Sequence, residues 1–166
     1  MSEVHDRLAD LVEESCIALF SDYLIAIKRS NEPAPTQQVA FCGVIGFTGD
    51  DMCGSLMLAC SREPLELTQV SGDAMMRDWI AELTNQLLGR VKNRLLACGT
   101  AIYSAVPVVL SGERIAPIAT QRLGHLFIAD AGVVSVWFDT ELRADFAFST
   151  VDDTSAIGRE GEAIFF

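Results

Sequence analysis

Apolar residues recur every three to four positions in two long parts of the chain, which is the period of an amphipathic helix. The first pattern begins at Val4 and predicts a helix from residue 3 to about residue 27. The second predicts a longer helix over about residues 74–98, stopped by Gly99. Residues 61–70 predict a short helix between them, with a serine at the N-cap and a proline in the first turn.

Shorter runs rich in β-branched and aromatic residues predict strands. They cover residues 39–47, 55–60, 101–110, 123–129, 133–138 and 144–148. Turn residues predict hairpins between the first two runs and between the fourth and fifth, and Gly43 and Gly46 indicate a bulge in the first. Helices beside a mostly antiparallel sheet predict an α+β fold in one domain, residues 1–166, with 149–166 as a flexible tail.

Composition narrows the functional classes. Half of the residues are apolar, which supports a core, and the formal net charge is −11. Such a charge repels nucleic acids and anionic membrane surfaces. The N-terminus lacks the apolar segment of a signal peptide and no run is long enough to span a membrane, so the cytoplasm is the expected location.

The sequence carries no recognisable metal-binding or cofactor motif. Its two histidines, His5 and His125, are far apart, and its five cysteines form no C-x-x-C pair. The cysteines are expected to be buried, reduced thiols. We therefore expect no metal or cofactor of the protein's own.

The long predicted helix separates two kinds of side chain. At about 100° per residue, Asp78, Glu82, Asn85 and Gly89 fall on one side of it, opposite an apolar stripe. The apolar stripe consists of Ile80, Leu83, Leu87 and Val91. An acidic solvated face is the ordinary state of such a helix. Asn and Gly are nevertheless poor helix formers, and Gly89 costs about 1 kcal/mol relative to Ala, so their place on this face favours a functional role.

The spacing of these residues is similar to a motif of the CheC, CheX and FliY phosphatases. That motif has Asp or Ser, three residues, Glu, two residues, Asn, and then Pro after about 22 residues. Here Asp78, Glu82 and Asn85 are followed by Pro107 after 21 intervening residues. The resemblance extends over roughly residues 37–140.

The resemblance implies an enzyme that hydrolyses the phosphoaspartate of a CheY-like response regulator. Asn85 would orient the attacking water, and Glu82 would pair with a lysine in the active site of the regulator. Asp78, Gly89 and Pro107 would support this site. The regulator would supply the Mg²⁺, and the protein would be a homodimer joined through its sheets.

Only one copy of the motif is present, whereas CheC-type members carry two. The first predicted helix has Asp6, Asp10 and Glu13 at related spacing but no Asn, which favours the CheX type. A non-catalytic adaptor or regulatory module with the same fold is the alternative function. Asn85 favours the phosphatase, because a pure adaptor has no need of that amide. A metabolic enzyme is disfavoured by the lack of a cofactor motif.

Overall fold

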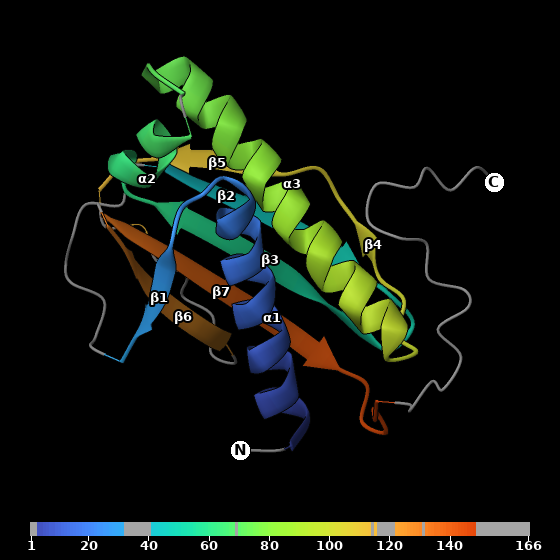
Figure 1. Cartoon of the computed structure of the whole chain (residues 1–166). Coiled ribbons are helices and arrows are strands. Elements are labelled where there is room, and N and C mark those ends of the chain that lie inside the picture. Colours follow the sequence, from blue (N-terminus) through green and yellow to red (C-terminus); the bar gives the residue numbers. More distant parts are fainter. Residues whose placement is uncertain are drawn as a thin grey trace.

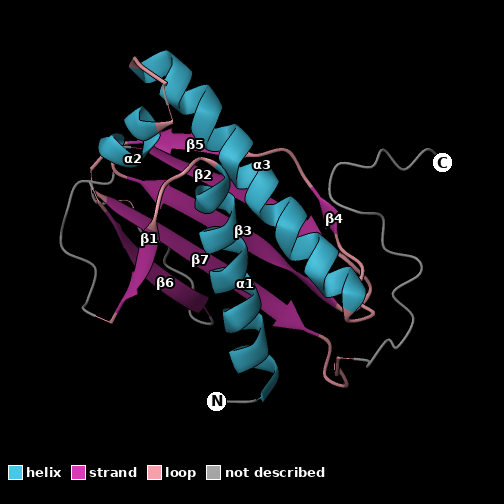
Figure 2. Cartoon of the chain, viewed as in Figure 1, coloured by secondary structure: helices cyan, strands magenta, loops and turns pink. Residues whose placement is uncertain are grey.

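The computed structural model describes residues 3–31, 41–68, 70–113, 115, 122–130 and 132–148. Seven antiparallel strands form one sheet, and the helices α1 and α3 lie together on one of its faces (Figures 1 and 2). The strand order is β1-β6-β7-β3-β2-β4, and β5 pairs with β2 on the same side as β4. The elements are α1 (Glu3–Asp22), β1 (Ile27–Ser30), β2 (Phe41–Thr48), β3 (Met52–Cys60), α2 (Arg62–Leu67), α3 (Asp73–Ala97), β4 (Tyr103–Ser104), β5 (Val108–Ser111), β6 (Arg122–Ala129) and β7 (Val133–Leu142). The predicted α+β class is confirmed.

A single large core lies between the two long helices and the sheet. The fully buried residues of α3 include the whole predicted apolar stripe, and α1 contributes Leu8, Val12, Leu19 and Phe20. The opposite face of the sheet holds only a small cluster around Met57 and Ala59. The helices therefore share one side of the sheet, where α3 packs mainly on β2.

Helix α1 ends earlier than its sequence pattern predicts. Leu24 adopts a left-handed conformation with φ of 61°, and its side chain is 96% exposed. The N–H of Ile25 donates to the carbonyl of Phe20 at 3.0 Å, which closes the helix end. Residues 27–30 then form β1, an edge strand that pairs with β6. This strand could not be predicted from the sequence, because no Gly or Pro marks the end of α1.

The bulge that glycines indicated in the first strand is not in the β2–β3 pairing, which runs without interruption from Phe41 to Thr48. Gly43 has a different role, because a Cβ there would lie 2.1 Å from Thr84 Oγ1 on α3. The glycine thus lets α3 approach the sheet closely. An extra residue does occur on the other side of β2, where the register shifts by one between its pairing with β4 and with β5.

The predicted strand over residues 144–148 is absent. After β7 the chain turns, with the N–H of Phe146 donating to the carbonyl of Arg143 at 2.9 Å. Arg143 also pairs with Asp145 at 2.6 Å, and the rings of Phe146 and Phe148 pack on the core. These aromatic residues are thus partly buried by a turn, which their composition alone did not distinguish from a strand. Residues 149–166, predicted as a tail, lie outside the described part.

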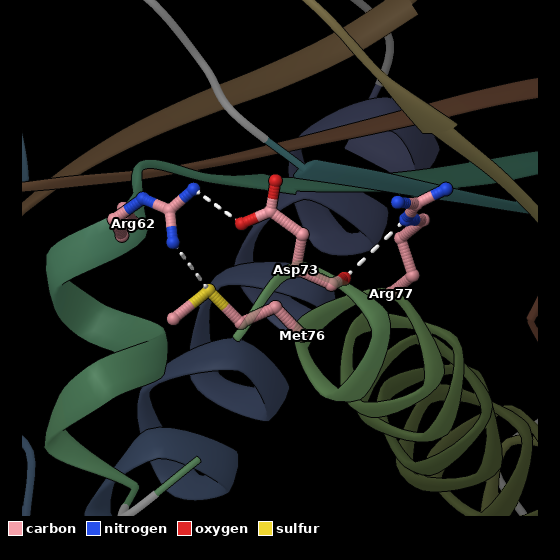
Figure 3. Close-up of polar contacts among 4 residues, drawn as sticks. All are labelled: Arg62, Asp73, Met76 and Arg77. Atoms are coloured by element: carbon pink, nitrogen blue, oxygen red, sulfur yellow. Dashed lines mark hydrogen bonds and ion pairs between the residues drawn. The ribbon is translucent and has the colours of Figure 1, made fainter. Parts of the chain in front are cut away.

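The beginning of α3 is fixed to α2 by a group of polar contacts (Figure 3). Arg62 donates to the carboxylate of Asp73 at 2.7 Å and to Met76 Sδ at 3.4 Å, while Arg77 Nε donates to the Asp73 carbonyl at 3.3 Å. The hydrogen bond from Arg62 lowers the pKa of the Asp73 carboxyl. Asp73 is also favourably placed in the first turn of a helix, where negative charge offsets the dipole.

Candidate active site

The predicted polar stripe lies on the outer face of α3. Asp78, Glu82 and Asn85 are all exposed, whereas Ile80 and Leu83, between them in sequence, are fully buried. Helix α3 ends as expected at Gly99, which has φ of 79°. A 25-residue helix packed along its whole inner face is a rigid support for side chains on its outer face.

Thr84 fixes the helix directly beneath Asn85. Its side chain is fully buried, and its hydroxyl donates to the carbonyl of Ile80 at 2.6 Å. The Cα of Gly43 faces it from β2. Asn85 therefore projects outward from a turn of α3 that packs closely on β2.

The carboxyl group of Glu82 makes one hydrogen bond among the described residues of the protein. Its Oε1 accepts a hydrogen bond from Gln86 Nε2 at 2.9 Å. In the described part of the chain, neither Glu82 nor Asp78 takes part in an ion pair. A surface carboxylate that the fold leaves uncompensated can pair with a cation on a partner.

Gly89 leaves an opening one turn beyond Asn85. Apart from the two neighbouring residues and the backbone of the helix itself, no heavy atom lies within 4 Å of the position that a Cβ would occupy at this residue. Packing inside the protein therefore does not require the glycine, and its cost to the helix remains uncompensated within the fold. The opening exposes the helix backbone beside the amide of Asn85.

Pro107 lies off the helix, in the segment between β4 and β5 that runs beside α3 (Figure 1). This is the place where the register against β2 shifts, which suits a residue that has no N–H to donate. At the β4 end, Lys92 Nζ lies 5.9 Å from the centre of the Tyr103 ring. The structure therefore groups four of the five predicted residues on one helix face and places the fifth on the neighbouring edge of the sheet.

Exposed apolar side chains surround Pro107. They are Tyr103, Val106, Val108 and Leu110, with exposed fractions from 44% to 83%, and we call this group the β4–β5 rim. The sequence pattern predicted a strand here but did not show that its apolar side chains are exposed. An apolar group of this kind at a sheet edge beside a polar site is typical of a surface that contacts another protein.

Two more side chains near Glu82 were not found from the sequence. Gln86 holds Glu82, and Tyr23 Oη donates to Gln86 Oε1 at 2.9 Å. The four-residue spacing of Glu82 and Gln86 was a usable signal, because such pairs face each other on a helix. Tyr23 follows α1 and is 63 positions away from Gln86, so no local pattern could have found it.

Within the described residues, features that would indicate a different chemistry lie away from the polar stripe or are lacking. A surface hollow of about 560 Å³ lies beside β1 and the end of β6, and it shares no residue with the polar stripe. Among the described residues, no group of three or more His, Cys, Asp or Glu side chains could hold a metal ion. Burial raises the pKa of the Cys42 thiol to about 12, which makes it a poor nucleophile. No described helix is long and apolar enough to cross a membrane.

Comparison with known families agrees with the motif. The family model described as "Chemotaxis phosphatase CheX" matches residues 41–128, just over half of the chain. The chain belongs to the CheX family. The resemblance seen in the spacing of Asp78, Glu82, Asn85 and Pro107 is thereby confirmed at the level of the family, and the matched segment contains all four of these residues. No curated protein matches the sequence significantly.

Solved structures show the same fold. The chemotaxis protein CheX from Vibrio vulnificus is similar with a TM-score of 0.73 and 18% identity, covering 81% of this chain and 99% of that one. A CheC-like superfamily protein from Shewanella sp. PV-4 has a TM-score of 0.72 and 20% identity, covering 81% and 97%. The complex of CheX with CheY, BeF₃ and Mg²⁺ from Borrelia burgdorferi gives 0.63 and 15%, covering 80% and 96%.

The CheX match begins with β2 and ends in β6, so it contains α3 and the β4–β5 rim. Helix α1 and Tyr23 lie outside it. The matched segment therefore contains the polar stripe and Gln86 but not Tyr23, which contacts Gln86.

Proposed function

We propose that this protein hydrolyses the phosphoaspartate of a CheY-like receiver domain by inserting Glu82 and Asn85 into the active site of that domain. The observation that carries the proposal is the exposed, uncompensated stripe of Asp78, Glu82 and Asn85 on a helix whose other face is fully buried. A relative of the same fold has been solved in complex with CheY, BeF₃ and Mg²⁺, which supports this class of partner.

Asn85 would act on the attacking water. A phosphoaspartate is an acyl phosphate and already reactive, so acceleration depends mainly on positioning and on stabilising charge. The Asn85 amide offers one acceptor for a water proton and one donor for an oxygen atom. The water oxygen forms a bond to phosphorus as the bond from phosphorus to the aspartate oxygen breaks, which releases phosphate and an aspartate carboxylate.

Glu82 would dock the partner. Its exposed carboxylate would pair with the active-site lysine of the receiver, and the excess of 23 acidic over 12 basic residues favours approach of a basic surface. The Mg²⁺ needed for the reaction is the one bound by the receiver, so this chain needs no ligands of its own. The protein would act in the cytoplasm, where its receiver partner is found.

The supporting residues would shape the contact. Asp78 lies one turn before Glu82 and extends the acidic surface. Gly89 leaves room for the receiver to approach the helix backbone beside Asn85. Pro107 lies where the register of the sheet edge shifts, next to the β4–β5 rim.

The decisive experiment follows loss of phosphate from a phosphorylated CheY-like receiver with and without this protein. Asn85→Ala should lower the acceleration on the order of 10²-fold, as removal of a positioned polar group does at other sites. It should fold normally, because Asn85 is exposed and Ala is the better helix former. Asn85→Asp should also fail because it removes the donor and adds negative charge, and Asn85→Gln should retain partial activity at best.

Binding is the control for this experiment. Asn85→Ala should still bind the beryllofluoride-activated receiver, because Glu82 is intact. Turnover by Asn85→Ala at the wild-type rate would refute the water-positioning role and would favour a non-catalytic binding module.

We also propose that the protein is a homodimer joined through its sheets. Strand β1 and the β4–β5 rim are the two outer edges of the sheet, and the rim exposes apolar side chains. Unpaired edges with apolar side chains favour association. Sedimentation equilibrium at tens of micromolar should give twice the chain mass of 18.0 kDa, and a monomer mass would refute the proposal.

A further inference from the structure

Two consecutive hydrogen bonds link Tyr23 through Gln86 to Glu82. The phenol of Tyr23 donates to Gln86 Oε1, and Gln86 Nε2 donates to Glu82 Oε1, each at 2.9 Å. A carboxylate only accepts hydrogen bonds, so the NH₂ group of Gln86 must face Glu82. The amide oxygen then faces Tyr23 and accepts from its hydroxyl. One orientation of the amide satisfies both contacts.

Tyr23 is itself held in place. It follows the last turn of α1, and its N–H donates to the carbonyl of Phe20 at 3.1 Å. Its half-buried ring meets the Trp79 ring edge-on, with centroids 5.4 Å apart and an interplanar angle of 85°. Trp79 precedes Glu82 by three positions on α3, so the phenol is fixed relative to the turn of helix that carries the carboxylate.

These two hydrogen bonds restrict the side chain of Glu82, which would otherwise be free to move. An exposed glutamate on a helix samples several rotamers, and immobilising such a side chain on binding weakens affinity roughly 2- to 10-fold. In Glu82 one carboxylate oxygen is already bound by the amide. In the described part of the chain, the other oxygen has no hydrogen-bond partner, so it is available to a cation.

We infer that Tyr23 and Gln86 are positioning residues that hold the carboxylate of Glu82 ready for the lysine of a receiver domain. The inference rests on the proposed function, in which Glu82 docks that lysine. It assigns a part in the site to Tyr23, the residue directly after α1, although Tyr23 lies outside the segment that matches the CheX family. The two residues act through Glu82 and contact no reacting atom.

The first test uses Tyr23→Phe, which keeps the ring contact with Trp79 and removes only the hydroxyl, and Gln86→Leu, which removes both hydrogen bonds. Each variant should raise the Kd for the beryllofluoride-activated receiver about 3- to 10-fold. The KM for the phosphorylated receiver should rise similarly, while kcat changes less because Asn85 is untouched. Asp22→Asn is the matched control, because it removes a neighbouring α1–α3 ion pair to Arg90 and leaves Glu82 as it is.

A double-mutant cycle with Glu82→Ala separates positioning from general support of the fold. In the Glu82→Ala background, Tyr23→Phe and Gln86→Leu should have no further effect on the Kd. An equal loss in both backgrounds, or the same loss in Asp22→Asn, would overturn the positioning role. The role would also be overturned if Glu82→Ala weakened binding and Tyr23→Phe did not. If Glu82→Ala itself left the Kd unchanged, the docking role in the proposed function would fail instead.

Discussion

Helices α1 and α3 contact each other on the same face of the sheet, but the carboxylates in the second half of α1 differ from those on the outer face of α3 in whether they form ion pairs. On α1, three carboxylates are paired with arginines of the same chain. These pairs are Glu13 with Arg29 at 2.5 Å, Asp22 with Arg90 at 2.5 Å, and Glu14 with Arg94. On the outer face of α3, Asp78 and Glu82 have no such partner among the described residues. The ion pairs give Glu13, Glu14 and Asp22 a structural role that the carboxylates of the polar stripe lack.

The same charge reversal on the two helices should give opposite results. Glu82→Lys should weaken binding of the activated receiver by at least about 10-fold, because it replaces an attraction for a lysine with repulsion across the contact. Glu14→Lys should leave binding unchanged and lower the free energy of unfolding by less than about 1 kcal/mol, because it breaks an exposed ion pair with Arg94.

Titration with the beryllofluoride-activated receiver and urea denaturation measure the two effects. Equal loss of affinity in both variants would show that overall negative charge, and not the position of Glu82, attracts the partner.

Gly89 should separate stability from binding on α3. Gly89→Ala and Gly89→Gln should each raise the free energy of unfolding by up to about 1 kcal/mol, because a Cβ there has open space around it and both residues are better helix formers. Only Gly89→Gln, with its longer side chain, should weaken receiver binding, by several-fold. If Gly89→Gln binds as tightly as the wild type, the opening beside Asn85 is not a contact surface.

On the α1 side, His125 should make stability depend on pH. Its ring is buried in β6, with Nδ1 3.6 Å from Glu13 Oε2. Burial and the charge of Arg29 lower its pKa, and Glu13 and Asp10 partly oppose this. The unfolded chain therefore takes up a proton near pH 6.5 that the folded protein does not, so stability falls as the pH decreases below that value.

Urea denaturation at pH 7.5 and pH 5.5 measures this loss of stability. His125→Gln removes the titrating ring and should show a smaller loss over the same interval than the wild type. Identical losses in the two proteins would contradict the prediction.

The parts predicted correctly from sequence depend on local patterns. The stripe of Ile80, Leu83, Leu87 and Val91 repeats within one helix, so it identified both the buried face of α3 and the outer face with Glu82. The end of α3 at Gly99 and the β2–β3 and β6–β7 hairpins were likewise predicted from glycines and turn residues at the positions concerned. In each case, residues close in sequence determine the conformation.

The parts that were wrong or missed depend on distant contacts. Strand β1 exists because β6 pairs with it, and α1 ends at a Leu24 that carries no stop signal. Gly43 was interpreted as the sign of a bulge. The fold requires a glycine there because Thr84 on α3, more than forty positions away, leaves no room for a Cβ. Tyr23 reaches the site only because α1 and α3 contact each other in the fold.

The close contact between Gly43 and Thr84 also sets how far Asn85 can reach. A methyl group at position 43 would meet Thr84 Oγ1 at 2.1 Å and the Ile80 carbonyl oxygen at 3.1 Å, so α3 would have to move away from the sheet or tilt. Asn85 projects from the outer side of that same turn and would move with it. A misplacement of about 1 Å can cost on the order of 10² in rate. If Asn85 positions the attacking water as proposed, the spacing between two layers inside the protein would help to determine the rate, and substitutions within the core would change the speed of dephosphorylation while every surface residue of the stripe stays the same.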